Sequence, residues 1–119
     1  MKFLCLIYED PVQVQQLPKA EFDKFVQDYL AFTKELEKSR HLEAGDALAP
    51  GHTPTTIRMH HGKPFQTFGP QENIKNTIGG FYVIKAKDLE EAIALMSRVP
   101  GLRLGSVEIR PIYDWQTRR

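Results

Sequence analysis

Six consecutive apolar residues near the start of the chain, Phe3 to Tyr8, constrain its fold most strongly. A run that is this short and continuous is typical of a β-strand with an apolar layer on each of its faces. Glu9, Asp10 and Pro11 end the run at once. We therefore expect an inner strand at the start of the chain.

Two amphipathic helices are predicted downstream of this strand. Apolar residues recur at spacings of three and four between residue 18 and about residue 40, which predicts the first helix. Its expected buried stripe is Phe22, Phe25, Val26, Tyr29, Thr33 and Leu36. Asp88, with Glu91 three residues later, forms a capping-box pattern that starts the second helix. Its expected buried stripe is Leu89, Ala92, Ile93 and Met96.

Strands are predicted at residues 42–48, 81–84 and 106–110. Residues 55–60 and 65–68 are predicted to form a hairpin whose turn is His61-Gly62-Lys63-Pro64. The order is strand, helix, strand, hairpin, strand, helix, strand. This order predicts an α+β, ferredoxin-like βαββαβ sandwich with a β-hairpin insertion. A length of 119 residues suits a single domain over residues 1–119.

Large apolar residues fall on both faces of the predicted sheet. Tyr82 and Ile84 alternate with Phe81 and Val83, so one pair faces the helices and the other faces away. Burying one side chain of this size is worth about 1.5–3 kcal/mol, which disfavours leaving the second face in water. We therefore predict a homodimer in which two sheets face each other.

Composition limits the partners and the cellular setting. Sixteen Lys and Arg balance 15 Asp and Glu, and both signs are interspersed, which argues against nucleic acid as a partner. No apolar stretch is long enough for a membrane span, and no cleavage site follows the first strand. A single cysteine excludes an internal disulfide and a cysteine-based zinc site. We expect a cytoplasmic protein without a membrane partner.

Much of the chain resembles the DGPF branch of the YCII-related proteins. The resemblance is carried by Phe68-Gly69-Pro70, by Gly79-Gly80-Phe81-Tyr82-Val83-Ile84 and by Gly105-Ser106-Val107-Glu108-Ile109-Arg110-Pro111. It implies a ferredoxin-like dimeric α/β barrel. Some YCII relatives are thought to be small enzymes with a His–Asp pair between helix and sheet. The DGPF branch often accompanies extracytoplasmic sigma factors, which implies a regulatory role as an alternative.

The sequence departs from both family patterns. In Phe68-Gly69-Pro70-Gln71, Phe68 replaces the Asp of the DGPF signature and Gln71 replaces its Phe. Tyr29 stands at the position of the family's helix-borne His, and Val99 at the position of its Asp. The acid–base pair of the enzymes is therefore absent by residue type.

Five polar residues are the candidate ligand-binding residues: Tyr29, Arg58, Lys75, Glu108 and Arg110. Tyr29 lies on the predicted buried stripe, where its hydroxyl needs a backbone partner or a ligand. Glu108 and Arg110 share one strand face and form either an ion pair at the dimer seam or a pocket for a small anion. Arg58 could add a positive charge, and Lys75 lies in the loop of the family signature.

Metal and nucleophile chemistry find little support in the sequence. His60 and His61 are neighbours on a predicted strand, so their rings are expected on opposite faces, and we expect no metal site and no cofactor. Cys5 lies in an apolar strand, where a thiolate is disfavoured.

Three functions remain open. The first is a homodimer that binds a small polar or aromatic ligand in a helix–sheet cleft, with a regulatory use. The alternative is a cofactor-free lyase, isomerase or dehydrochlorinase in which Tyr29 is the acid or base. The third is a dimerisation module without a ligand.

Overall fold

The structure, a computed structural model, describes residues 1–49, 53–72 and 76–118. Its elements follow the predicted order, with two short helices added. They are β1 (Lys2–Glu9), α1 (Pro11–Gln15), α2 (Lys19–Lys38), β2 (Leu42–Ala47), β3 (Thr55–His60), β4 (Lys63–Phe68), β5 (Thr77–Lys85), α3 (Leu89–Met96), the 3-10 helix η1 (Pro100–Leu104) and β6 (Gly105–Pro111). The additions are α1 and η1, in segments that the sequence predicted as connections.

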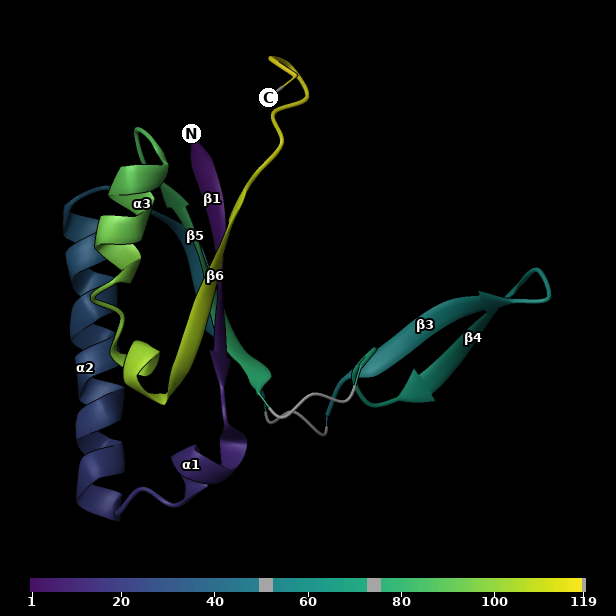
Figure 1. The fold of residues 1–119 in the computed structure, drawn as a ribbon, viewed down its shortest axis with the longest axis horizontal. Coiled ribbons are helices and arrows are strands. Elements are labelled where there is room, and N and C mark those ends of the chain that lie inside the picture. The colour runs from purple at the N-terminus through teal and green to yellow at the C-terminus, as the bar shows by residue number, and fades with distance from the viewer. Residues whose placement is uncertain (50–52, 73–75, 119) are drawn as a thin grey trace.

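Four strands form one antiparallel sheet in the order β2-β5-β1-β6, and α2 and α3 both cover the same face of it (Figure 1). The inner strand β1 pairs Cys5 with Tyr82 of β5 on one side and with Ile109 of β6 on the other. Between β1 and β5 the register shifts so that Gly79 is left without a partner on β1. The chain is therefore a mixed α+β protein with an antiparallel sheet.

The apolar core lies between the helices and the sheet. Alternate residues of β1, namely Phe3, Cys5 and Ile7, point into it and are at most 3% exposed, which confirms the core role of Cys5. The remaining apolar members of this core cluster are Phe32, Leu36, Tyr82, Ile84, Ala86, Ala92, Met96 and Val99. Val107 and Ile109 of β6 pack against the cluster, so Glu108 and Arg110 point to the other face of the sheet.

Each helix buries a narrower stripe than the sequence predicted. In α2 the buried residues are Phe25, Phe32 and Leu36, whereas Phe22 and Val26 are 42% and 39% exposed. In α3 the buried residues are Ala92 and Met96, whereas Leu89 and Ile93 are about half exposed. A helix on one side of a sheet contacts it along a single row, and the exposed residues lie on the flanks of that row.

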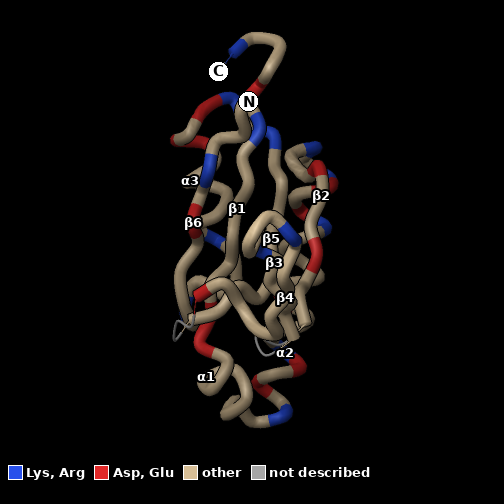
Figure 2. Tube along the Cα trace, turned by 90° about the vertical axis from the view of Figure 1, so that its right-hand side faces the viewer, with Lys and Arg blue, Asp and Glu red and all other residues tan. Residues whose placement is uncertain are grey.

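The second face of the sheet is covered by neither helix. Its middle consists of half-buried apolar or aromatic side chains, and charged residues lie mainly toward the edge strands (Figure 2). The middle residues are Leu4, Leu6, Tyr8, Phe81 and Val83. We call this surface the open face. It has the apolar character from which the sequence predicted a second copy of the chain.

Residues 55–68 form a two-stranded arm, β3 and β4, that projects away from the body on the side of the open face (Figures 1 and 2). His61 and Gly62 connect the strands with φ angles of +51° and +77°. Positive φ at both central residues is the pattern of a type I′ turn, whose twist matches that of the strands. The predicted hairpin is thus confirmed, but its turn is shorter than predicted, because Lys63 and Pro64 belong to β4 and pair with β3.

Two aspartates begin the helices that follow β1 and β5. The Asp10 side chain accepts a hydrogen bond from the Val12 amide at 2.9 Å, and Pro11 occupies the first turn of α1. Asp88 accepts from the Glu91 amide at 2.9 Å, while Glu91 accepts from the Lys87 amide at 3.0 Å. The predicted cap of the second helix is therefore confirmed. Within the described residues, no helix is long and apolar enough to cross a membrane.

Candidate functional site

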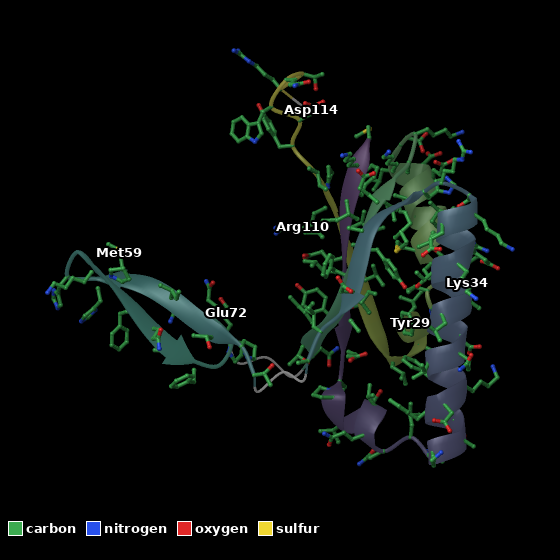
Figure 3. All side chains as sticks on the ribbon, turned by 180° about the vertical axis from the view of Figure 1, so that it is seen from behind. Tyr29, Lys34, Met59, Glu72, Arg110 and Asp114 are labelled. Atoms are coloured by element: carbon green, nitrogen blue, oxygen red, sulfur yellow. The ribbon has the colours of Figure 1, made fainter. Side chains whose placement is uncertain are left out.

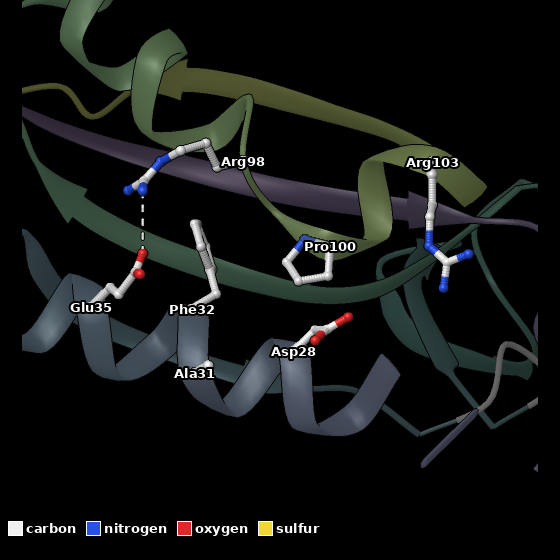
Figure 4. A pocket seen from close by; sticks show the side chains of 7 residues that line it. All are labelled: Asp28, Ala31, Phe32, Glu35, Arg98, Pro100 and Arg103. Atoms are coloured by element: carbon white, nitrogen blue, oxygen red, sulfur yellow. Dashed lines mark hydrogen bonds and ion pairs between the residues drawn. The ribbon is translucent and has the colours of Figure 1, made fainter. Parts of the chain in front are cut away.

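A groove of about 420 Å³ runs between α2 and the segment that links α3 to β6 (Figure 4). The groove is shallow and open to solvent along much of its length, so a bound molecule would keep one side exposed. Seven residues line the groove: Asp28, Ala31, Phe32, Glu35, Arg98, Pro100 and Arg103. The lining combines an apolar base with two acidic and two basic side chains, so it suits a small molecule that is both flat and polar.

The charges in the groove are unevenly paired. At one end, Arg98 Nη1 and Glu35 Oε2 form an ion pair at 3.2 Å. At the other end, Asp28 is bound by Lys24 at 3.2 Å, and the Arg103 guanidinium lies 5.3 Å from the centre of the Phe25 ring. No ion pair of Arg103 occurs among the described residues. A cation held over an aromatic ring without a carboxylate partner can receive an anionic group of a ligand.

Tyr29 does not line this groove and lies on the side of α2 that faces the sheet (Figure 3). Its ring packs edge-on against Phe25 with centroids 5.2 Å apart. Its hydroxyl oxygen accepts a hydrogen bond from the Gly101 amide in the first turn of η1. A Cβ at Gly101 would overlap this oxygen, so only glycine permits the contact. The backbone partner that the sequence left open for this phenol is therefore Gly101.

Burial raises the pKa of the Tyr29 hydroxyl above its usual value, and the nearby Tyr82 and Glu9 raise it further. The hydrogen bond from Gly101 offsets only part of this rise. A phenol in such surroundings stays protonated at neutral pH and is a poor general base.

A second acidic group, Glu9, lies near Tyr29 at the end of β1. Its carboxylate rests against Gly79, where a Cβ would overlap it, and burial raises the pKa of this carboxyl. Close by, the Tyr82 hydroxyl is hydrogen-bonded to Thr33 Oγ1 at 2.7 Å. Glu9 is not among the predicted site residues, although its period-two spacing from Cys5 and Ile7 places it on the face toward the helices.

The other predicted site residues lie elsewhere in the molecule. Glu108 and Arg110 are on the open face, with Arg110 Nε 3.7 Å from Glu108 Oε1, so the predicted ion pair forms within one chain. Arg58 is on the arm and donates a hydrogen bond to the Gln71 carbonyl at 3.1 Å. Lys75 is outside the described residues. Within one chain, Tyr29 therefore does not share a site with Arg58, Glu108 or Arg110.

The histidines differ from their predicted arrangement. His61 is a turn residue rather than part of the strand, and its ring lies edge-on to that of His60 with centroids 4.2 Å apart. The expectation that the two rings point to opposite faces is therefore wrong. The described part of the chain holds no group of three or more His, Cys, Asp or Glu suited to a metal ion.

A Ser–His–Glu chain at the C-terminal end of α2 is structural. His41 Nδ1 lies 2.7 Å from Ser39 Oγ, and His41 Nε2 lies 3.4 Å from Glu91. Ser39 Oγ also donates to the Leu36 carbonyl at 3.2 Å. The end of a helix presents carbonyl oxygens, which would repel the oxyanion of an acyl-transfer reaction. These contacts join α2, β2 and α3 instead.

Comparisons with known proteins place the chain in a family. An uncharacterised protein of Rhizobium meliloti (strain 1021) is 25% identical over 114 residues, which cover 94% of this chain and 92% of that protein. A solved structure of 5-chloro-2-hydroxyhydroquinone dehydrochlorinase (TftG) from Burkholderia phenoliruptrix AC1100, in complex with 2,5-dihydroxybenzoquinone, has a similar fold. The TM-score is 0.56 at 16% sequence identity, and the match covers 100% of both chains. The YCII-related domain matches residues 1–116, and the chain therefore belongs to this family.

Proposed function

We propose that this protein is a homodimer of the DGPF branch that binds a small, anionic, polar aromatic molecule in the groove between α2 and η1. The observation that carries the proposal is Arg103, which is held over Phe25 at the end of a groove of the right size. The aromatic plane of the ligand would lie against Ala31 and Pro100, above the buried ring of Phe32. Its carboxylate or phenolate would bind Arg103, and a hydroxyl group would donate to Asp28.

The proposed dimer pairs the open faces of two sheets. The strand order β2-β5-β1-β6, with both helices on one face, supports the ferredoxin-like topology that such a dimer needs. Leu6 lies directly opposite Phe81 on this face, so both lose contact with water on pairing. Glu108 and Arg110 flank this apolar centre and would lie at the dimer seam. Arg58, on the arm, does not line the groove, and the role predicted for Lys75 stays a prediction.

Binding of 2,5-dihydroxybenzoquinone, followed by isothermal titration calorimetry, tests the ligand proposal. This planar, acidic compound is the molecule named in the TftG complex. We expect saturable binding by the parent protein and at least a tenfold loss of affinity in Arg103→Gln. Lys38→Gln, at the exposed end of α2, serves as a charge-matched control. An Arg110→Gln variant that loses affinity while Arg103→Gln keeps it would refute the groove and favour the open face.

The alternative function is a cofactor-free dehydrochlorinase. Two observations favour it: the fold similarity to TftG, and a half-buried Glu9 whose carboxyl pKa is raised by burial. In this function Glu9, rather than Tyr29, would take the proton as chloride leaves the substrate. Chloride release from a chlorinated hydroxyhydroquinone, measured with an ion-selective electrode, should then occur in the parent and vanish in Glu9→Gln. Glu21→Gln is the control, and absence of release from the parent would exclude this substrate class.

A further inference from the structure

The chain exposes much more surface than a compact protein of its size. Its accessible surface is 8904 Å², whereas a folded monomer of this mass exposes about 6,600 Å². Its radius of gyration is 16.4 Å, against about 13.5 Å expected for this length. The surplus of about 2,300 Å² is larger than the roughly 800 Å² that each partner buries in a standard protein–protein interface.

The arm contributes much of this surplus of exposed surface. Cross-strand pairing places Ile57, Met59, Pro64 and Phe68 on one face of the ribbon. Ile57 and Met59 are 68% and 69% exposed, and Phe68 is 87% exposed. An isolated two-stranded hairpin is marginally stable in water, and large apolar side chains exposed on one face of it mark an interaction surface.

Three exposed apolar features lie on the same side of the molecule. The open face and the arm are on the side away from the helices, and the C-terminal segment after β6 also leads away from the helix layer (Figure 1). This segment carries Tyr113 and Trp115, whose rings pack edge-on at 4.7 Å while Trp115 stays 84% exposed. One partner on this side can cover all three features.

The arm and the body are also complementary in charge. Residues 55–68 include Arg58 and Lys63 but no acidic residue. Asp46 on β2 and Glu108 on β6 lie at the two edges of the open face, and Glu108 is paired with Arg110, so Asp46 is the carboxylate offered to a basic arm. A surface that complements itself in this way is what a two-fold symmetric interface requires. The chemistry therefore favours a second copy of this chain over an unrelated protein.

We propose that the arm of each subunit reaches past the open face and clasps the body of the partner subunit. This inference rests on the proposed face-to-face dimer and adds an intertwined contact to it. Each arm strand has six residues, a length of about 20 Å. Facing sheets pack about 10 Å apart, so an arm that starts on the open side extends beyond the partner's sheet.

Dimer affinity, measured by sedimentation over a dilution series, tests the clasp. We compare the parent with Ile57→Gln/Met59→Gln in the arm and with Leu30→Gln/Ile93→Gln as a matched control. Leu30 and Ile93 are similarly exposed apolar residues, but they lie on the helices. We expect at least a tenfold rise in the dissociation constant for the arm variant and no change for the control.

Paramagnetic relaxation gives a second readout that does not depend on weakening the dimer. A nitroxide is attached at Met59→Cys, because the native Cys5 thiol is 0% exposed and stays unlabelled. In mixtures with an isotopically labelled, nitroxide-free partner, we expect broadening of partner resonances. A dimer that keeps its affinity in the arm variant and shows no broadening overturns the clasp but leaves the face-to-face dimer intact. A monomeric parent overturns both.

Discussion

Replacing Tyr29 with phenylalanine removes one atom from the contact that positions η1. The Phe25–Tyr29 ring packing is retained in the variant, because the phenyl ring occupies the same place. The hydroxyl oxygen is lost, and with it the acceptor of the Gly101 amide, which lies in the first turn of η1 where the helix offers no partner of its own. Gly101 is buried, so water cannot easily replace the oxygen.

The expected loss of stability in Tyr29→Phe follows from the burial of Gly101. A buried donor that loses its partner destabilises a protein by about 1–3 kcal/mol. The pH dependence adds a second signature. Since burial raises the pKa of Tyr29 above the value of about 10 in the unfolded chain, its contribution to stability is present below pH 10 and is lost as the pH rises above 10. Tyr29→Phe should remove this part of the alkaline destabilisation.

Urea unfolding followed by circular dichroism measures both effects, with Lys34→Ala on the exposed side of α2 as the control. Amide exchange adds a local readout, because the Gly101 amide should exchange faster in Tyr29→Phe at pH 7. A variant that matches the parent in unfolding free energy, with Gly101 exchange unchanged, would refute the role assigned to the phenol. In that case, a contact other than the one between Tyr29 and Gly101 would have to position Pro100 and Arg103.

Four further predictions concern stability. Burial raises the pKa of Cys5 from 9.0 to about 11, so stability should fall by about 3 kcal/mol between pH 9 and 11, and Cys5→Ala should flatten this slope in urea titrations. Asp88→Ala should cost about 1 kcal/mol through the loss of its cap on the Glu91 amide, seen as a lower Tm. The exposed Lys19–Asp23 ion pair contributes less to stability than the Asp88 cap does. Asp23→Ala should therefore change the unfolding free energy by under about 0.5 kcal/mol. Gly45→Ala should destabilise by about 1–3 kcal/mol and alter the near-ultraviolet circular dichroism, because a Cβ there would lie 2.6 Å from Tyr82 Cδ1.

Local patterns were sufficient to predict the order of the elements. Continuous hydrophobicity identified β1, a spacing of three and four identified α2, and the Asp88–Glu91 pair identified the start of α3. The alternation in β5 also separated its residues correctly into two sets, one on each face of the sheet. These features depend on neighbours in the sequence, and each is therefore readable without the tertiary structure.

The groove could not be predicted in this way. It exists because Pro100 and Gly101 form a 3-10 turn that the Tyr29 hydroxyl holds, and that contact joins two distant parts of the chain. The sequence showed Pro100 and Gly101 only as the end of a helix. No local pattern identified Arg103, because its interaction partner, the Phe25 ring, lies on α2, far from Arg103 in the sequence.

In the proposed function, ligand preference is set by the segment from Arg98 to Arg103. The sheet and α2 supply the framework, and their packing rests on residues such as Phe3, Leu36 and Ile84, which are fully buried and have no access to a ligand. The short segment from Arg98 to Arg103 supplies two of the four charged side chains in the groove. Under the proposed function, substitutions in this segment change which small molecule binds without disturbing the core, whereas substitutions at Tyr29 alter both the segment and the stability of the fold.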